Sequence, residues 1–299
     1  MQVVRASPTR EQNQGDNEMA GYFTEENSIE AVNGRMGKDI NPRLAEVMAC
    51  LIKHLHAFAQ DIQLTQDEWN YGIEFLTRTG QMCSSERQEF ILLSDALGFS
   101  MLVDAINNRR PARATENTVF GPFHVKGAPV RQMGDSINLD GKGESCLYEG
   151  RVIDLDGKPI EGARIDVWSD SAEGFYDVQQ PGVQPRWNNR GIFVTRSDGA
   201  YRFAGIKPVS YPIPDDGPVG QMLGHLGRHP YRPAHMHYLV TAEGYQKLVT
   251  HIFVAGDAYL ESDAVFGVKS SLIGVFERVV NGATLWRSPF DFVLARTAR

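Results

Sequence analysis

The sequence predicts an α+β fold in which a helical N-terminal layer precedes a β-sandwich of mixed strand topology. Between about residue 41 and residue 110, apolar residues recur at three- and four-residue steps, which is typical of amphipathic helices. After about residue 125, short stretches alternate apolar and polar residues, and turn residues separate these stretches. Two long connections, residues 169–190 and 207–231, interrupt the predicted strands, and long connections of this kind commonly carry function.

The first predicted segment is a polar N-terminal arm, residues 1–40. It is rich in Gln, Asn, Glu, Gly and Ser and poor in large apolar residues, so we expect it to be frayed or draped over the surface. A helical domain is predicted over residues 41–125 and the β-sandwich over residues 126–299. The first helix of the helical domain is expected to pack through one apolar stripe, formed by Leu44, Val47, Met48, Leu51, Leu55, Phe58 and Ile62.

Two more helices complete the predicted first layer. Thr65 and Glu68 form a capping-box pattern at the start of the second helix, which should end near Gly80. The pattern Ser85–Gln88 opens a third helix, which is expected to continue to the break before Pro111.

The predicted strands begin with a pair. Residues 150–154 and 163–168 are expected to pair through the turn at 156–159. Two further segments are predicted, a strand at 201–203 after an Asp-Gly turn and a β-hairpin formed by residues 235–241 and 248–254.

Composition excludes several classes of protein. The net charge is -7 and no block of Lys and Arg occurs, which argues against a nucleic-acid-binding surface. Cys50, Cys83 and Cys146 are odd in number and far apart in the sequence, so neither a disulfide framework nor a thiolate metal site is indicated. No signal peptide and no apolar stretch of membrane-spanning length is recognisable, and we therefore expect a cytoplasmic protein.

Histidines mark the predicted hairpin as a candidate metal site. His235 and His237 are separated by one residue, so on a strand both side chains project from the same face and can bind one metal ion. His251 follows on the return strand, and each long connection contributes a tyrosine, Tyr176 and Tyr211. Taken singly, these residues fit half-buried histidines and loop aromatics that cap the core equally well.

As a set, these residues resemble a known ligand group. Their order and spacing are similar to those of the four iron ligands of the intradiol ring-cleavage dioxygenases, the family of catechol and hydroxyquinol 1,2-dioxygenases. The matching positions are Tyr176, Tyr211, His235 and His237. The resemblance spans roughly residues 44–285 and includes the helical layer, the 150–168 strand pair and the 224–229 segment that leads to Arg232.

The resemblance implies a ferric ion as cofactor. A free phenol titrates at about 10, so only a strongly Lewis-acidic cation holds two tyrosines as phenolates at neutral pH. Two phenolates also stabilise Fe(III) over Fe(II), while two imidazoles complete four protein ligands.

A reaction is implied as well. The substrate ring binds iron through two adjacent hydroxyl oxygens, Tyr211 leaves the metal and acts as general base, and Arg232 stabilises negative charge on the ring during attack by dioxygen. The ring then opens between the two hydroxylated carbons, with both oxygen atoms inserted.

His251 indicates which ring is cleaved. The catechol-cleaving branch usually has glutamine at this position, whereas histidine resembles the hydroxyquinol-cleaving branch, as do segments 211–214 and 263–269. The expected activity is therefore cleavage of hydroxyquinol (1,2,4-trihydroxybenzene) to 3-hydroxy-cis,cis-muconate or its tautomer maleylacetate, with His251 as a further catalytic residue. Catechol or chlorocatechol cleavage is the alternative.

Carrying the substrate pocket over by position gives eight wall residues: Leu92, Asp95, Val119, Phe120, Gly121, Ile213, Pro214 and Val265. Asp95 could accept a hydrogen bond from the third ring hydroxyl, which catechol lacks. Alternatively, Asp95 caps or solvates its helix.

Partners and a different class of protein complete the expectations. The turn pattern within 150–168 is also similar to prealbumin-type sandwich modules, many of which bind ligands without catalysis, but such a module has no reason to keep the full ligand set. The resemblance implies a homodimer formed through the helical layer, with the stripe from Leu44 to Ile62 as contact surface. Some family members hold a phospholipid at that interface, and the sequence leaves open whether this chain does.

Overall fold

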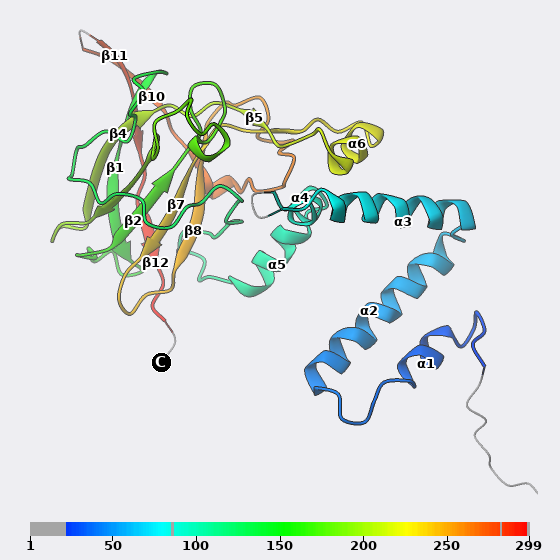
Figure 1. Ribbon diagram of the computed structural model, residues 1–299. Helices are drawn as coiled ribbons and strands as arrows, with labels where there is room; N and C mark the ends of the chain where they lie inside the picture. The colour runs from blue at the N-terminus through cyan, green and yellow to red at the C-terminus, as the bar shows by residue number, and fades with distance from the viewer. Residues whose placement is uncertain (1–21, 85–86, 282, 298–299) are drawn as a thin grey trace, which may run out of the picture. The chain divides into compact units, whose positions relative to one another are not determined.

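The computed structural model describes residues 22–84, 87–281 and 283–297. The chain divides into two compact units, residues 1–74 and 75–299. The described part of the first unit contains α1 (Ser28–Asn33), α2 (Pro42–Asp61) and the first half of α3 (Gln66–Gln81), and the second unit contains the remaining elements (Figure 1).

Two helices begin at the residues that the sequence indicates. The side chain of Asn41 accepts hydrogen bonds from the backbone N–H groups of Arg43 and Leu44, at 2.9 and 3.2 Å, and so caps α2. The capping box of α3 is confirmed, because Thr65 N–H donates to Glu68 Oε2 at 2.9 Å and Glu68 N–H donates to Thr65 Oγ1 at 3.3 Å. Within the described ranges, no helix combines the length and the apolar character needed to cross a membrane.

The predicted third helix is wrong as a single element. It consists of α4 (Glu89–Ala96) and α5 (Phe99–Asn107), and Ser85, its predicted start, lies outside the described residues. Gly98 has φ +71°, a left-handed conformation that ends α4 and lets α5 leave in another direction.

The expectation of a frayed or surface-draped arm is wrong for residues 28–33, which form α1. This short helix packs against α2, where Ser28 Oγ lies 3.1 Å from His56 Nδ1. Gln60 of α2 also donates to the backbone carbonyl of Glu25 at 2.9 Å. Contacts with α2 rather than local propensity therefore order this segment.

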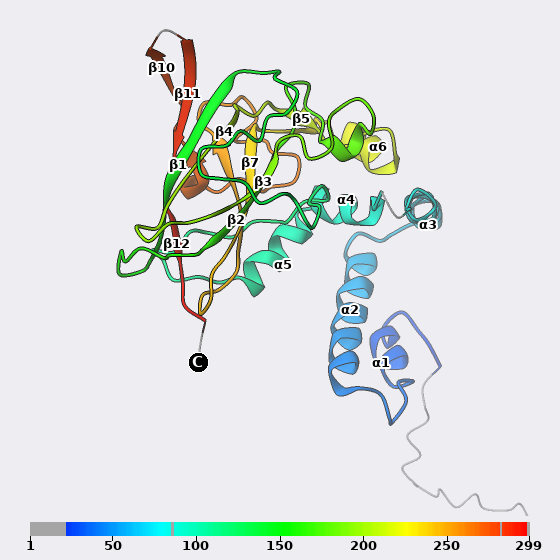
Figure 2. The same ribbon diagram turned by 60° about the vertical axis from the view of Figure 1, so that its left-hand side comes forward.

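A two-layer β-sandwich forms most of the second unit (Figures 1 and 2). The first sheet contains β1 (Ser145–Asp154), β4 (Ala200–Ile206), β10 (Glu277–Asn281), β11 (Ala283–Pro289) and β12 (Phe292–Leu294). The second sheet contains β2 (Arg164–Trp168), β3 (Arg190–Val194), β7 (His235–Thr241), β8 (Leu248–Val254) and β9 (Ile273–Gly274). The predicted mixed topology is confirmed, since β1 pairs in parallel with β11 and β12 but antiparallel with β4.

The remaining elements cover the sandwich or connect its strands. They are β5 (Tyr211–Pro212), β6 (Tyr231–Arg232), α6 (Pro218–His225) and two turns of 3₁₀ helix, Asp177–Gln179 and Ser270–Leu272. Strands β5 and β6 pair with each other. Both views show α4 and α5 beside the sandwich (Figures 1 and 2).

The predicted pairing of the segments 150–154 and 163–168 is wrong. Strand β1 belongs to the first sheet and β2 to the second, so the intervening turn carries the chain from one layer to the other. Each strand must cover one side of the same core, and pairing the two would place both in one layer. The predicted hairpin of β7 and β8 is confirmed, with His237 opposite His251.

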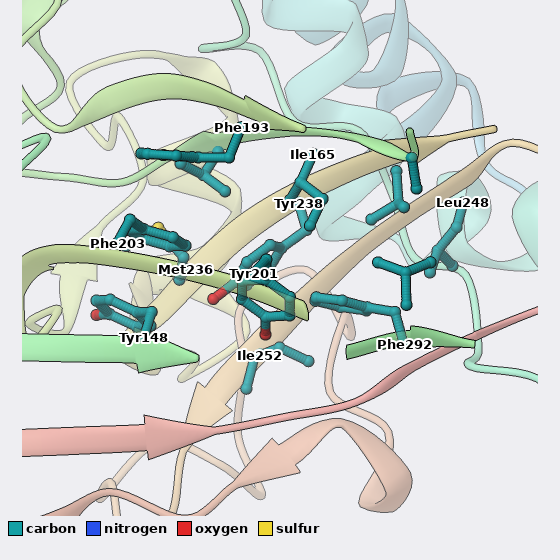
Figure 3. Close-up of a cluster of buried hydrophobic side chains, with 14 of the residues drawn as sticks. Tyr148, Ile165, Phe193, Tyr201, Phe203, Met236, Tyr238, Leu248, Ile252 and Phe292 are labelled. Atoms are coloured by element: carbon teal, nitrogen blue, oxygen red, sulfur yellow. The ribbon is translucent and has the colours of Figure 1, made fainter. Parts of the chain in front are cut away.

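The core lies between the two sheets. The first sheet contributes Tyr148, Phe203 and Phe292, while Met236, Tyr238 and Ile252 come from the second (Figure 3). Because side chains alternate along a strand, Met236 and Tyr238 face this core, and His235 and His237 of the same strand face away from it. A candidate site is thus placed on the outer face of the second sheet.

Candidate metal centre

Four donor atoms converge on the outer face of β7. The Tyr176 hydroxyl lies 3.3 Å from the Tyr211 hydroxyl and 2.9 Å from His237 Nε2, and the Nε2 atoms of His237 and His235 are 3.1 Å apart. All four side chains belong to residues that are at most 4% exposed. The structure therefore brings the four predicted ligands together in one buried cluster.

Three separate segments position these side chains. Tyr176 lies directly before the 3₁₀ turn Asp177–Gln179, where its backbone N–H donates to Gln179 Oε1 at 2.9 Å. Tyr211 belongs to β5 and pairs with Arg232 of β6. Strand β7 supplies both histidines, so the two long connections deliver the tyrosines to the sheet that carries the imidazoles.

The surroundings of the two histidines favour neutral imidazoles, and one of the two rings is held in the tautomer that binds a metal ion through Nε2. His235 Nδ1 donates to the Pro233 carbonyl at 2.7 Å, which leaves the lone pair on Nε2. Burial holds the pKa of His235 and of His237 well below the ordinary value, and the positive charge of Arg232 contributes to both shifts. Neutral imidazoles whose Nε2 atoms converge on the two phenol oxygens fit a metal ion at the cluster.

The two tyrosines need a cation to ionise. Burial raises the pKa of Tyr176 well above its ordinary value and also raises the pKa of Tyr211, where the nearby charge of Arg232 acts in the opposite direction. Two phenol oxygens beside two neutral imidazoles form a hard, oxygen-rich donor set, which suits a strongly Lewis-acidic ion such as Fe(III).

Arg232 and His251 lie beside the four donors. Arg232 Nη1 donates to His235 Nε2 at 3.2 Å, and Arg232 Nη2 donates to His251 Nδ1 at 3.4 Å. The ligand atoms of the three histidines lie within 4.8 Å of one another, so His251 is the remaining histidine close enough to contribute. His251 Nδ1 accepts from Arg232, which places the His251 ring beside both the arginine and the donor cluster.

The predicted pocket residues form two groups. Leu92, Ile213 and Val265 pack in one apolar cluster with residues of α4 and α6. Asp95 and Pro214 line a small pocket together with Leu92 and with Phe123, whose ring stacks on Tyr176 at 4.5 Å between centroids. Phe123 thus joins this pocket to the donor cluster.

The second group is the loop that contains Val119, Phe120 and Gly121. The Phe120 ring centroid lies 5.6 Å from that of Trp168. Burial lowers the pKa of His251, and a hydrogen bond with the backbone of Val119 acts in the opposite direction. A Cβ atom at Gly121 would stand 3.2 Å from His237 Cε1. This loop therefore lies against the histidines.

Several residues of the site were not predicted from the sequence. Trp168 stacks on His237, with centroids 4.8 Å apart and ring planes at 12°. Arg190 and Asp177 form a buried ion pair of 2.6 Å next to Tyr176, and Asp263 binds Arg232. Strand alternation could have placed Trp168 on the outer face, but no local signal connects Asp263 with an arginine 31 residues earlier.

Comparisons with known families agree with this geometry. The family model described as "Catechol dioxygenase N terminus" matches residues 41–115, and the model described as "Dioxygenase" matches residues 119–296. The chain belongs to the intradiol ring-cleavage dioxygenase family. Members of this family are in general iron-dependent enzymes, which confirms the enzyme class over a non-catalytic sandwich module.

Individual intradiol dioxygenases share most of the chain. A hydroxyquinol 1,2-dioxygenase of Rhizobium sp. (strain MTP-10005) is 56% identical over 92% of this chain and 97% of its own. A 6-chlorohydroxyquinol 1,2-dioxygenase of Cupriavidus pinatubonensis is 49% identical over 92% and 99%. The solved structure of a hydroxyquinol 1,2-dioxygenase from Pseudomonas putida DLL-E4 superposes with a TM-score of 0.86 at 44% identity, covering 91% of this chain and 97% of that chain.

Proposed function

We propose that this intradiol dioxygenase binds Fe(III) through Tyr176, Tyr211, His235 and His237 and cleaves hydroxyquinol. The observation that carries the proposal is the convergence of two phenol oxygens and two imidazole nitrogens in one buried cluster, with distances of 2.9 to 3.3 Å between neighbouring donors. The relatives named as hydroxyquinol and chlorohydroxyquinol dioxygenases support the choice of substrate.

When bound, the ferric ion supplies the Lewis acidity that favours the deprotonated form of the two adjacent ring hydroxyls. One molecule of dioxygen and one molecule of hydroxyquinol then give one molecule of maleylacetate. Both atoms of dioxygen enter the product, and the bond between the two hydroxylated carbons breaks.

Tyr211 is the proposed general base. Its phenol oxygen would help to hold the ferric ion and would take up the proton that a substrate hydroxyl gives up. Support comes from its place beside Arg232 in the β5–β6 pair and from the charge of Arg232, which favours the phenolate of Tyr211 against the effect of burial. Tyr176 is stacked on Phe123 and is held by the turn that follows it, so it is proposed to remain a ligand.

Arg232 is proposed to stabilise negative charge that develops on the ring. Its side chain is 4% exposed, so its charge acts in a medium of low polarity. His251 accepts a hydrogen bond from the same guanidinium group, which supports a role for His251 in keeping this cation beside the substrate.

Asp95 is proposed to recognise the third hydroxyl of hydroxyquinol. The residue is 8% exposed, and burial raises the pKa of its carboxyl group, while a hydrogen bond from Ser100 opposes that shift. Its side chain lines the pocket that Phe123 joins to Tyr176, so its position does not resemble that of a solvated helix residue.

A substitution tests the role of Asp95. Asp95→Ala should raise the KM for hydroxyquinol about tenfold or more, because the third hydroxyl loses its acceptor, and should leave the KM for catechol nearly unchanged. An equal loss on both rings contradicts the role in recognition.

Oxygen consumption tests the function as a whole. The iron-loaded protein is supplied with hydroxyquinol and with catechol side by side, with correction for autoxidation of hydroxyquinol and with maleylacetate as the product measured. Strong preference for hydroxyquinol is expected. Equal or better cleavage of catechol would be compatible with the iron site but would refute the assignment of hydroxyquinol as the substrate. Tyrosine phenolates bound to Fe(III) absorb visible light, so a colourless protein that retains no iron would refute the proposed ligands.

We also propose that the chain forms a homodimer through its N-terminal helices. None of the residues of α2 is buried. Six large apolar side chains of α2 and of the residue that caps its C-terminus are about half exposed: Leu44, Val47, Leu51, Leu55, Phe58 and Ile62. Such an apolar face is typical of a protein contact or a lipid contact. Light scattering should give twice the mass of the chain, and a monomer would contradict the proposal. Solvent extraction followed by mass spectrometry tests separately whether a phospholipid is bound to the protein.

A further inference from the structure

Asp263 binds one edge of the Arg232 guanidinium. Its Oδ1 accepts from Arg232 Nε at 3.1 Å and its Oδ2 accepts from Arg232 Nη2 at 3.4 Å, and the two side chains are 2% and 4% exposed. A carboxylate that binds two nitrogens of a planar guanidinium fixes both its position and its orientation. Arg232 therefore has little freedom to rotate.

The carboxylate of Asp263 is itself fixed by the turn that follows it. The backbone N–H of Val265 donates to Oδ1 at 3.3 Å, and the backbone N–H of Gly267 donates to Oδ2 at 2.8 Å. Four donors thus converge on one buried carboxylate, two from the arginine and two from the chain. Val265 is also a wall residue of the proposed pocket, so the same turn carries part of that wall.

Tertiary contacts hold this turn in a strained conformation. Phe266 has φ +59°, which is unfavourable for a bulky side chain. The Arg228 guanidinium lies 4.7 Å from the centre of the Phe266 ring and donates to the carbonyl groups of Ala96 and Ala264. These contacts stabilise the strained turn and keep the Asp263 carboxylate in place.

Asp263 contacts Nε and Nη2 of Arg232, so Nη1 of the guanidinium remains available to the donor cluster. Nη1 of Arg232, which Asp263 does not contact, lies 3.2 Å from Nε2 of His235, the nitrogen proposed to bind iron. A rotation of the guanidinium would exchange these two edges and move Nη1 away from the donor cluster.

We propose that Asp263 is a positioning residue that orients Arg232 toward the reacting ring. The inference rests on the proposed function, since it gives Arg232 its role. The Asp263 carboxylate binds the arginine and its own turn, and it acts on the donor cluster through Arg232. Its loss should therefore lower kcat while leaving substrate binding and the metal ligands nearly unchanged.

A double-mutant cycle tests this role in the full-length, iron-loaded protein. Asp263→Asn keeps the shape of the side chain and should lower kcat for hydroxyquinol about 10- to 100-fold. This is less than the roughly 100- to 1,000-fold loss seen when a charge-stabilising donor is removed outright, because Arg232 itself remains. The anaerobic Kd of hydroxyquinol should change by less than about threefold, and the visible absorption of the resting protein should not shift. In the Arg232→Gln background, Asp263→Asn should change kcat by less than about twofold, because the two residues act as one unit.

Stability of the metal-free protein provides a readout that does not depend on activity. Each single substitution leaves a buried partner unpaired, so the two effects on the midpoint of urea unfolding should not add. Additive effects in this measurement would show that the two side chains are not coupled, and would overturn the inference.

A second variant serves if Asp263→Asn does not fold. A Cβ at Gly267 would stand 3.0 Å from Arg232 Nη2 and 3.1 Å from Asp263 Oδ2, so Gly267→Ala displaces the pair while both charges remain. The expected result is a smaller loss of kcat with the same unchanged Kd. Gly224→Ala is the matched control, because no atom lies within 4 Å of its added Cβ.

The outcomes separate the inference from the proposed function. A wild-type protein that cleaves neither hydroxyquinol nor catechol refutes the proposed function. An active wild-type protein in which Asp263→Asn lowers kcat equally with and without Arg232, or in which the loss appears in Kd, overturns only the role of Asp263.

Discussion

Gly121 provides the sharpest test of how the site is held. It has φ +74°, and its backbone lies so close to His237 that an added Cβ would stand 3.2 Å from His237 Cε1. The Cε1 atom lies between the two ring nitrogens, so a push on this atom also moves Nε2. We therefore expect Gly121→Ala to move one of the four proposed ligands.

Two effects of Gly121→Ala can be estimated. A residue with a Cβ in the left-handed region costs about 1–2 kcal/mol of folding free energy. The contact of 3.2 Å requires the imidazole ring to shift by a few tenths of an ångström. Changes to the residues that orient a metal ligand typically lower metal affinity by about 10- to 100-fold, and we expect a loss of iron affinity in that range.

Gly127→Ala is the matched control. Gly127 has φ +87°, so alanine there has a similar backbone cost, but no atom lies within 4 Å of the added Cβ. Urea unfolding of the metal-free proteins should show similar losses of stability for both variants. Competition with an iron chelator should show weaker iron binding only for Gly121→Ala. The visible absorption band expected from charge transfer between the tyrosine phenolates and Fe(III) should shift only in that variant.

A specific result would refute this reasoning. If Gly121→Ala binds iron as tightly as Gly127→Ala and has the same visible band, then the contact of Gly121 with His237 does not position the ligand. If Gly127→Ala also loses iron affinity, then backbone strain in this region, and not the contact, accounts for the effect.

Two further predictions concern stability of the metal-free protein. Burial lowers the pKa of His235, His237 and His251, so below about pH 6.5 the unfolded chain binds more protons than the folded chain. The free energy of unfolding should therefore fall as the pH drops below that value, by up to about 1.4 kcal/mol per pH unit for each histidine. Urea unfolding at pH 7.5 and at pH 5.5 measures this loss of stability. The substitution His251→Gln should make the loss smaller, and equal stability of the wild-type protein at both pH values would contradict the prediction. Arg190→Leu should cost about 3–5 kcal/mol because it leaves the Asp177 carboxylate buried without its partner, and adding Asp177→Asn should recover much of the loss in the same assay. A single variant as stable as the wild type would show that water reaches Asp177.

Local patterns in the sequence were sufficient for several elements. The capping box of Thr65 and Glu68 predicted the start of α3, because a cap depends on residues only three positions apart. The hairpin of β7 and β8 and the alternation along β7 placed His235 and His237 on one face. The spacing of the ligand residues, through the family resemblance, indicated an iron-dependent ring-cleaving enzyme.

Other features depended on packing between distant segments. The left-handed break at Gly98 and the placement of β1 and β2 in different sheets follow from how the layers meet, since the local pattern of apolar residues is the same in either arrangement.

The detail of the site was decided in the same way. Tyr176 and His237 lie 61 positions apart in the sequence, and Arg232 lies 31 positions from Asp263, yet each pair is within hydrogen-bond distance in the fold. The sequence by itself determined which residue types are available and which strand face carries the imidazoles. Only the tertiary structure decided which side chain orients Arg232 and which backbone presses on His237, because such contacts depend on where long connections close over the sheet.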